Sequence, residues 1–493
     1  MKVKLFLALG LGLFPGCNSI EDDASIEITR EVINADYIGN GVQWDAYPEA
    51  ESWGAAVSDE DWNKLYERLD YMQPQYVRCM INSPFRYFNP ETGEYEKERN
   101  IGPLKRVLQY CHDNNITVLF GEFNPPTWEM KNDQRWIEMA ANYLNYLVIE
   151  LGFDCIKYYN LFNEPDGHWA STNGDFDLWK EMILRFQREM KKYPGLTEKV
   201  SIAGPDVVVD YNNPESKYNS FEWVDQTVFQ LDSVTGIYDI HAYPGQHQVR
   251  SGNFRDLIGR YKKNIPEDKK IIFGEAGYKY WREADSSLMQ EYNKRAEVHP
   301  FTKGSDSNMM VYDYFYGLDM SMLAMDIMNG GFSAIAAWML DDAMHSDGDS
   351  GNTKDIKLWG MWNILGEEVF GSPEEENIRP WYYTWSLMCR YFPTGTDVLN
   401  VNGQLPEEIR AVAGSKDGKF SLALVNVSDK EQIIRLQLPE DLKNVQEFVY
   451  QKDFRPKNDL GYPVPNRKNF TIPQEYELTL ENESFFLLTT FPY

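Results

Sequence analysis

Cysteine and histidine are scarce in this sequence, with five and six residues among 493. Cys79, Cys111, Cys155 and Cys389 fall in predicted strands and helices without paired spacing, so we expect buried free thiols. The sequence also has no glycine-rich phosphate loop and no zinc-type cluster of ligands. These absences argue against a disulfide framework and predict a protein without a cofactor or a metal.

Positive charge is scarce as well. The 48 Lys and Arg residues face 76 Asp and Glu residues, which gives a formal net charge of -28. A strongly negative surface repels phosphate backbones, so nucleic acid is not an expected partner. Nothing in the sequence indicates an oligomeric state.

Long apolar runs are absent except at residues 5–14, which follow Lys2 and Lys4 and are too short to span a bilayer as a mature helix. The run leads into the tetrapeptide FPGC at Cys17, which resembles a bacterial lipoprotein signal whose cysteine becomes the lipidated first residue. The acidic residues 21–23 resemble the export tag of surface lipoproteins, although a solvated linker could have the same acidic composition. We therefore expect a signal segment at 1–17 and an exported lipoprotein at the outer membrane, facing the cell surface or the periplasm.

Residues 36–392 alternate short strand-like runs with amphipathic helical stretches. Eight such units predict a (β/α)8 TIM barrel. A doubly wound sheet could use the same alternation, but polar and aromatic residues clustered after the strands favour the closed barrel. The expected strands are 41–44, 75–81, 117–122, 157–163, 200–206, 237–243, 270–276 and 332–339. The expected helices are 59–72, 103–114, 136–151, 176–192, 254–264, 312–329 and 379–390.

From residue 393 to 493 the pattern changes to short alternating runs separated by Gly, Pro, Asn and Asp, which is typical of an antiparallel β-sandwich. The expected strands are 409–413, 420–426, 432–437, 446–450, 476–480 and 484–490. Residues 18–35 form an acidic linker and a further strand-like run, 26–32, that we expect to join this sandwich. Such a strand would clamp the two domains together.

Two glutamates, Glu164 and Glu275, come where strand-like runs end, in the stretches NLFNEPDG and IIFGEAGY. The carboxyl ends of barrel strands meet at one rim, so we expect the two side chains to lie close together. Breaking a glycosidic bond needs such a pair, because one group protonates the leaving oxygen while the other attacks or stabilises the sugar carbon. Either glutamate alone could be a salt-bridge partner at the rim; the pair favours glycoside hydrolysis.

The residues at the strand ends resemble glycoside hydrolase clan A, a group of retaining glycosidases on this barrel. The clan has Asn-Glu after the fourth strand and a second Glu after the seventh, where this chain has NEP at 163–165 and GEAG at 274–277. The layout is most similar to families 30 and 39, and NPPTWEMK at 124–131 resembles a family 30 stretch with Glu129 inserted. The first strand lacks the Gly-Gly run typical of family 30, so families 5 and 158 remain open.

This resemblance implies a role for each residue at the rim. Glu164 would be the general acid/base and Glu275 the nucleophile that forms a covalent glycosyl-enzyme. Asn163 would bind the 2-hydroxyl of the cleaved sugar, Tyr243 would hydrogen-bond the nucleophile, and Arg78 would hold the nucleophile ionised. For Arg78, a structural ion pair inside the barrel would leave the same sequence signal.

Aromatic residues and one histidine complete the expected site. His241 lies on the same strand face as Tyr243, and either could instead be a core residue. Trp338 resembles the tryptophan after the eighth strand that stacks on the sugar. Four further tryptophans follow strands and could form outer subsites or pack the loops: Trp44, which we include among the substrate-binding residues, Trp128, Trp169 and Trp281.

The sequence thus predicts a retaining glycoside hydrolase that acts on a poly- or oligosaccharide, with β-linkages favoured. Three alternatives stay open: a transglycosylase, a glycan-binding lipoprotein on an inactive barrel, and an inverting enzyme that uses Glu122 or Asp45. The loop 347–352 has acidic residues like those of a calcium site, but it lacks the ligand spacing of an EF-hand. The Met-rich stretch 320–328 is expected to lie in the core.

Overall fold

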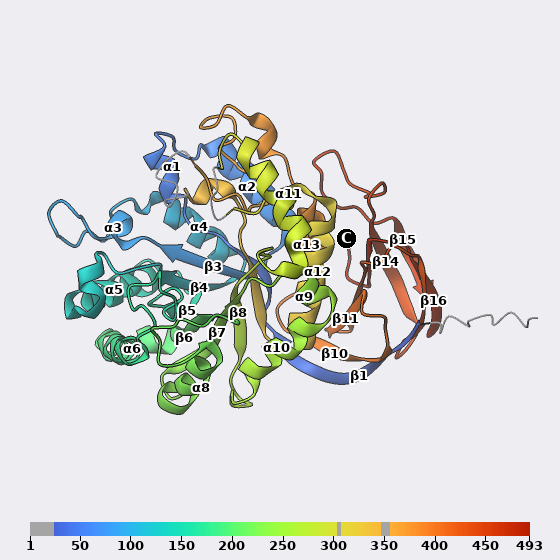
Figure 1. The fold of residues 1–493 in the computed structure, drawn as a ribbon, viewed down its shortest axis with the longest axis horizontal. Coiled ribbons are helices and arrows are strands. Elements are labelled where there is room, and N and C mark those ends of the chain that lie inside the picture. The colour runs from blue at the N-terminus through green and yellow to red at the C-terminus, as the bar shows by residue number, and fades with distance from the viewer. Residues whose placement is uncertain (1–23, 303–306, 347–354) are drawn as a thin grey trace, which may run out of the picture.

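The structure is a computed structural model that describes residues 24–302, 307–346 and 355–493. The expected signal segment with Cys17 and the loop 347–352 lie outside these described residues. Figure 1 shows a barrel ringed by helices and, beside it, a sheet domain built from the C-terminal strands and β1.

Eight parallel strands close into the barrel, and β9 pairs back with β2. Each observed strand overlaps a range expected from the apolar runs, so the (β/α)8 prediction is confirmed. The strands are β2 (Gly39–Gln43), β3 (Tyr76–Ile81), β4 (Thr117–Glu122), β5 (Ile156–Asn160), β6 (Ser201–Val208), β7 (Thr235–Ala242), β8 (Ile271–Ala276) and β9 (Ala334–Ala337).

The helices between these strands bury their apolar faces against the barrel wall, and several begin with the capping chemistry that the sequence carries. Ser58 caps α2 by accepting a hydrogen bond from the Asp61 backbone N–H at 3.1 Å, while the Asp61 carboxylate accepts one from the Ser58 backbone N–H. The long helices are α2 (Asp59–Met72), α4 (Ile101–Asp113), α5 (Gln134–Asn145), α6 (Phe176–Met190), α8 (Ser220–Leu231), α10 (Asn253–Lys262), α11 (Ser286–Val298), α12 (Tyr314–Asn329) and α13 (Trp381–Arg390). The short ones are α1 (Pro48–Ser52), α3 (Ser83–Arg86), α7 (Leu196–Lys199) and α9 (Gln246–Arg250).

Single turns extend or join these helices: η1 (Trp128–Asn132), η2 (Tyr146–Glu150), η3 (Glu283–Asp285), η4 (Met309–Tyr312), η5 (Asp342–Met344) and η7 (Pro373–Glu376). The methionines of α12 are all buried, as expected for a core helix. The four described cysteines are buried and unpaired, also as expected.

The C-terminal domain is one nine-stranded sheet in the order β15-β14-β17-β12-β11-β10-β1-β13-β16. Its strands are β1 (Ala24–Tyr37), β10 (Thr396–Gln404), β11 (Ile409–Lys416), β12 (Lys419–Asn426), β13 (Gln432–Gln437), β14 (Leu442–Tyr450), β15 (Arg467–Ile472), β16 (Glu475–Leu480) and β17 (Ser484–Thr489). The N-terminal strand β1 runs antiparallel to β10 and parallel to β13, so the sheet is mixed rather than purely antiparallel. Alternate side chains of these strands form a core of their own, whereas side chains of the opposite face, among them Val412, Val425 and Leu487, belong to the same core cluster as the barrel.

The sheet domain docks on α12 and α13, on the outside of the barrel (Figure 1). Tyr314 and Tyr450 stack with ring centroids 4.5 Å apart, and each hydroxyl donates to the other's backbone carbonyl. A buried ion pair joins Arg410 Nε to Asp326 Oδ1 at 2.9 Å. Among the described residues, no helix has both the length and the apolar composition that crossing a membrane requires.

Inside the barrel, apolar and polar side chains form separate layers, because alternate residues of each strand point inward. Tyr76 of β3, Ile237 of β7 and Ile272 of β8 belong to a small apolar cluster. The next inward positions on β3 and β7 are Arg78, Asp239 and His241, all fully buried. The barrel therefore carries a charged layer above its apolar floor, at the carboxyl ends of the strands.

Candidate active site

Local backbone irregularities aim the two glutamates into this charged layer. Glu164 follows β5 and has a left-handed backbone with φ of 46°, which is unusual for a residue other than glycine. Its N–H donates to Asp206 Oδ2 at 3.1 Å, which stabilises that conformation. On β8 the pairing with β7 skips Gly274, and this register shift turns Glu275 from the wall toward the interior.

The two carboxyl groups face each other across a short gap. One oxygen of Glu164 and one of Glu275 lie within 4.8 Å, with His241 between them. Side-chain exposure is 13% for Glu164 and 6% for Glu275, so both remain reachable at the rim. A sugar carbon and its leaving oxygen fit between two carboxyls at this spacing.

Glu275 is held by three groups, one from β3 and two from the carboxyl end of β7. Arg78 forms an ion pair with Oε1, and the Tyr243 hydroxyl donates to Oε2 at 2.7 Å. His241 Nδ1 lies 3.5 Å from the same Oε2. Burial by itself lowers the pKa of Arg78, but Glu275 and Asp206 outweigh it and raise that pKa above its ordinary value. The guanidinium is thus a fixed positive charge beside Glu275.

Glu164 has one partner on each carboxyl oxygen. His241 Nδ1 lies 2.9 Å from Oε1, and the indole N–H of Trp169 donates to Oε2 at 2.7 Å. The neighbouring Asn163 accepts a hydrogen bond from Arg78 Nη2 at 2.7 Å through its amide oxygen. The structure therefore brings together Arg78, Asn163, Glu164, His241, Tyr243 and Glu275.

Asp206 of β6 is a central residue that the sequence reading missed. It is fully buried, with Oδ1 2.8 Å from His241 Nε2 and Oδ2 3.2 Å from Arg78 Nη2. Burial lowers the pKa of His241, yet the charges of Asp206 and Glu275 outweigh it and hold that pKa well above its usual range. The sequence did contain a sign of this role, because Asp206 is a polar residue at the carboxyl end of the expected strand 200–206.

A second aspartate, Asp239 of β7, lies directly below this group. One of its oxygens accepts a hydrogen bond from the Gly274 N–H at 2.7 Å. Burial and the neighbouring charge of Asp206 raise the pKa of Asp239 well above its ordinary value, whereas His241 and Arg78 lower that of Asp206 against the opposite effect of burial. Of these two buried aspartates, Asp206 is therefore the one whose ionised form is favoured.

Trp338 follows β9 and is 8% exposed. Its ring stacks on His345, with centroids 5.3 Å apart and 20° between the planes. His345 Nε2 in turn lies 2.6 Å from Asp45 Oδ2. His345 was not expected from the sequence, because it lies in an irregular segment beyond the strand.

The expectation that Trp44 is a substrate-binding residue requires a correction. It is fully buried and packs between α2 and α4, with its ring 6.4 Å from Trp62 and 5.7 Å from Tyr110. The side chain alternates with those of Gln43 and Asp45, which hydrogen-bond each other. Trp44 is a core residue of the helix layer, and the structure does not bring it to the site.

The carboxylates of the inverting alternative are occupied by internal bonds. Glu122 is fully buried and accepts hydrogen bonds from Tyr87, Tyr159 and Trp136 at 2.7, 2.6 and 3.1 Å. Asp45 is also fully buried and accepts bonds from Gln43, from the Met80 N–H and from His345. Neither carboxylate is placed to activate a water molecule.

The remaining tryptophans after strands lie at the rim and are exposed: Trp128 by 52%, Trp169 by 40% and Trp281 by 65%. Trp169 touches Glu164, as described above. Near Trp281, the Lys279 ammonium lies 5.2 Å from the Trp281 ring centroid and 4.8 Å from that of Tyr243.

The cluster has the ligand types of a metal site, since Glu164, His241 and Glu275 offer atoms within 4.8 Å of one another. Arg78, however, pairs with Glu275 and Asp206 and places a fixed positive charge among these ligands. A cation there would be repelled by the guanidinium. This chemistry suits an uncharged ligand better than a metal ion.

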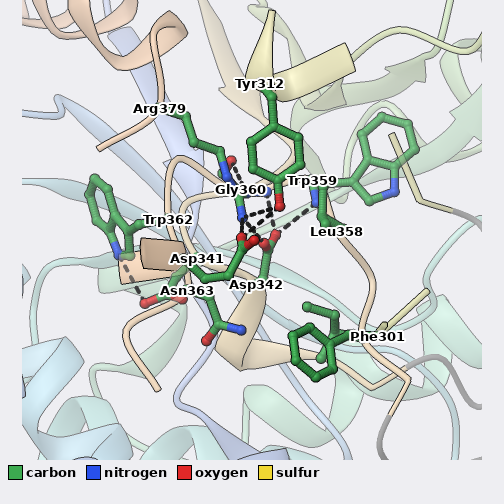
Figure 2. A network of polar contacts seen from close by, with 12 residues as sticks. Phe301, Tyr312, Asp341, Asp342, Leu358, Trp359, Gly360, Trp362, Asn363 and Arg379 are labelled. Atoms are coloured by element: carbon green, nitrogen blue, oxygen red, sulfur yellow. Dashed lines mark hydrogen bonds and ion pairs between the residues drawn. The ribbon is translucent and has the colours of Figure 1, made fainter. Parts of the chain in front are cut away.

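Buried aspartates also gather in the segment after β9 (Figure 2). Asp342 accepts hydrogen bonds from the N–H groups of Trp359 and Gly360 at 2.8 and 2.6 Å and pairs with Arg379 at 2.6 Å. Asp341 accepts bonds from two backbone N–H groups, from the Trp362 indole at 3.0 Å and from Tyr47. This network fixes Trp359, whose ring packs edge-on against Tyr243 at 5.6 Å.

No family model and no curated protein matches the sequence. Solved structures do match: a GH30 endoxylanase from Clostridium papyrosolvens C71 (TM-score 0.56, 12% identity, covering 95% of this chain and 99% of that one) and a GH39 β-xylosidase from Caulobacter crescentus (0.60, 10%, 95% and 100%). A conserved exported protein from Bacteroides fragilis also matches (0.61, 13%, 94% and 100%). The chain shares the fold of the endoxylanase and the β-xylosidase over nearly its whole length.

Proposed function

We propose that the protein is a retaining glycoside hydrolase that cleaves a β-linked poly- or oligosaccharide through a glycosyl-enzyme intermediate. The observation that carries this proposal is the approach of Glu164 and Glu275 oxygens to within 4.8 Å. Retaining enzymes hold their carboxyl groups about 5–5.5 Å apart, whereas inverting enzymes leave about 6.5–9.5 Å for a water molecule. The fold shared with an endoxylanase and a β-xylosidase supports a β-linked substrate.

In the first step Glu275 attacks the anomeric carbon, and the bond from that carbon to the leaving oxygen breaks. Glu164 gives its proton to that oxygen, so the leaving group departs as a neutral alcohol. Arg78 and Tyr243 orient the Glu275 carboxylate for this attack. Asn163, fixed by Arg78, binds the 2-hydroxyl as positive charge develops on the ring.

In the second step water attacks the same carbon and releases Glu275. Glu164, now a carboxylate, takes a proton from that water. His241 lies between Glu164 and Asp206 and is held in its protonated form by the surrounding carboxylates. The imidazolium therefore stabilises the negative charge that Glu164 carries between the two steps.

The test is to incubate the protein and its Glu275→Gln variant with xylo-, cello-, laminari- and mannotetraose and with the 2,4-dinitrophenyl β-glycosides of the same sugars. We expect the wild type to cleave at least one tetrasaccharide and to release the β-anomer first, as proton NMR would record. Release of the α-anomer would contradict retention. Binding without cleavage of any substrate would support a glycan-binding protein instead.

A transglycosylase would pass through the same intermediate and differ only in its acceptor. Mass spectrometry of the tetrasaccharide reactions separates the two activities, because transfer gives products longer than the substrate. Shorter products alone support the hydrolase.

We also propose that the protein is exported and lipidated at Cys17, on the basis of the FPGC sequence that follows the apolar run. Expression in a diderm bacterium should give a membrane-bound protein whose N-terminal peptide has the mass of a diacylglyceryl cysteine. A Cys17→Ser variant should lack that mass and partition away from the membrane. An unmodified Cys17 in the wild-type peptide would contradict this proposal.

A further inference from the structure

Trp169 is exposed by 40% although its indole N–H is bonded to Glu164 Oε2 at 2.7 Å. Single exposed aromatic residues are common on protein surfaces and need no function. This one differs because its polar edge is tied to the expected proton donor while much of the ring stays open. His241 occupies the other oxygen, Oε1, from the buried side. Trp169 is therefore the partner of Glu164 on the side open to solvent.

The indole is held rigidly in this position. A side chain on Gly167 would meet the Trp169 ring at 2.3 Å, so the ring packs directly on the glycine backbone. Tyr211 lies 4.8 Å from the Trp169 ring centroid, and His168 lies 4.9 Å from it. His168 Nδ1 and the Tyr211 hydroxyl are 2.8 Å apart, which ties these two neighbours together. A flat ring fixed in this way is suited to stacking on the apolar face of a sugar.

The chemistry of the reaction places Trp169 relative to the bond that is cleaved. A general acid must lie beside the leaving oxygen, since it delivers a proton to that atom. The residue bonded to the solvent side of Glu164 therefore lies on the leaving-group side. Trp281 lies instead near Tyr243 and Glu275, through Lys279.

We propose that Trp169 has two separable roles: its ring, with Tyr211, stacks on the sugar of the leaving group, and its indole N–H orients the carboxyl group of Glu164. The inference rests on the proposed function and narrows its substrate. The leaving group is a sugar of an oligosaccharide or polysaccharide chain, rather than a small alcohol or an aryl group.

Three variants separate the two roles. Trp169→Phe keeps a ring and removes the N–H, Trp169→Ala removes both, and Gly167→Ala displaces the ring without changing it. Phe229→Ala, which removes an aromatic side chain that is 68% exposed on α8, is the matched control. Thermal unfolding of each variant shows that it is folded.

Kinetics are measured on the tetrasaccharide cleaved fastest among xylo-, cello-, laminari- and mannotetraose, and on the 2,4-dinitrophenyl β-glycoside of the same sugar. The aryl glycoside needs neither a proton nor a sugar in the leaving-group site. We expect Trp169→Ala and Gly167→Ala to raise KM for the tetrasaccharide by about tenfold, with a clearly smaller loss on the aryl glycoside. Phe229→Ala should change neither substrate.

Trp169→Phe should keep KM for the tetrasaccharide near the wild-type value and lower kcat. Loss of a donor to the Glu164 carboxylate disfavours its charged form, so the basic limb of the kcat/KM profile should move to higher pH. A purely structural role for the indole would not shift this limb.

The outcomes distinguish this inference from the proposed function. Equal losses on both substrates for Trp169→Ala, or an unshifted pH profile for Trp169→Phe, would overturn the inference while hydrolysis stands. A wild type that cleaves the aryl glycosides and no tetrasaccharide would also overturn it. A wild type that cleaves neither kind of substrate would overturn the proposed function and the inference together.

Discussion

Two groups of carboxylates lie at the carboxyl ends of the barrel strands, and they are held in different ways. Glu164 and Glu275 accept bonds from described residues only through side chains, which come from β3, β7 and neighbouring loops. Asp341 and Asp342 instead each accept two backbone N–H groups, besides side-chain donors. The first pair keeps some exposure, whereas the second pair is fully buried.

This difference suits the two groups to different roles: Asp341 and Asp342 to holding the chain in place, and Glu164 and Glu275 to a chemical step. A carboxylate that accepts backbone N–H groups fixes the path of the chain and cannot change its charge without disturbing that path. A carboxylate held by side chains from separate strands can exchange a proton or a bond while the strands stay in place. The Asp342 network also serves the first group, because it fixes Trp359 against Tyr243.

The largest expected effect is a loss of catalytic rate. Glu275→Gln removes the attacking oxygen anion, so we expect kcat on the tetrasaccharide to fall by roughly 10⁴-fold or more. Glu283→Gln, the same change at an exposed residue of η3, is the control and should keep full activity. A Glu275→Gln variant with more than a tenth of wild-type kcat would exclude Glu275 as the nucleophile.

Of the two groups, the one around Glu164 and Glu275 could be predicted from the sequence, because strand periodicity and barrel topology decide which residues meet at the rim. Arg78, Glu164, His241 and Glu275 follow from reading the strand ends in order. The same alternation of side chains, applied to Gln43 and its neighbours, would have placed Trp44 outside the barrel.

Other features could not be read in this way. The bond from Trp169 to Glu164 and the stacking of His345 on Trp338 arise in irregular segments, which have no periodicity to read. The inward turn of Glu275 depends on a register shift at Gly274, which the pattern of apolar and polar residues in this strand does not predict. The catalytic and binding roles of the rim residues stay predictions until kinetics test them.

The second effect concerns Asp342, one of the two aspartates that accept backbone N–H groups. Arg379→Met leaves Asp342 buried without its cation, so we expect the free energy of unfolding to fall by about 3–5 kcal/mol. Urea unfolding at pH 7 measures this loss. Arg30→Met breaks an ion pair whose side chains are 71% and 64% exposed, and it should cost less than about 1 kcal/mol. Equal costs for the two changes would remove the distinction drawn between buried and exposed pairs.

A third effect appears in the pH dependence of stability. Burial alone would raise the pKa of Glu375, but His299, Arg379 and Tyr312 outweigh it and lower that pKa to about 2. Because the folded pKa is depressed, the stabilisation is present above about pH 4.5 and is lost as the pH falls toward 2.

Glu375→Gln tests this dependence directly. We expect the variant to be less stable than the wild type by about 2–3 kcal/mol at pH 7, with the difference shrinking as the pH approaches 2. Urea unfolding at pH 7, 5 and 3 would record it. A difference that does not change with pH would mean that packing, rather than charge, accounts for the contribution of Glu375.

The smallest expected effect compares the two aspartates beneath Glu164 and Glu275. The charge of Asp206 raises the pKa of His241, and the pKa of Asp206 itself is lowered, whereas that of Asp239 beside it is raised. Asp206→Asn removes that charge, although Glu275 and Glu164 still face His241 and Arg78 still opposes them. The pKa of His241 should therefore fall, so that at pH 7 a smaller fraction of the enzyme carries the imidazolium beside Glu164, and kcat/KM at this pH should fall by about tenfold.

Asp239→Asn makes the same substitution at the aspartate whose neutral form is favoured, because burial and Asp206 raise its pKa. We expect it to keep kcat/KM at pH 7 near the wild-type value, because it changes both shape and charge little. Measuring kcat/KM of both variants on the tetrasaccharide separates the effect of charge from that of a buried amide. Equal losses in the two variants would show that the protonation of His241 depends on the packing of this layer, and not on the charge of the aspartate bonded to it.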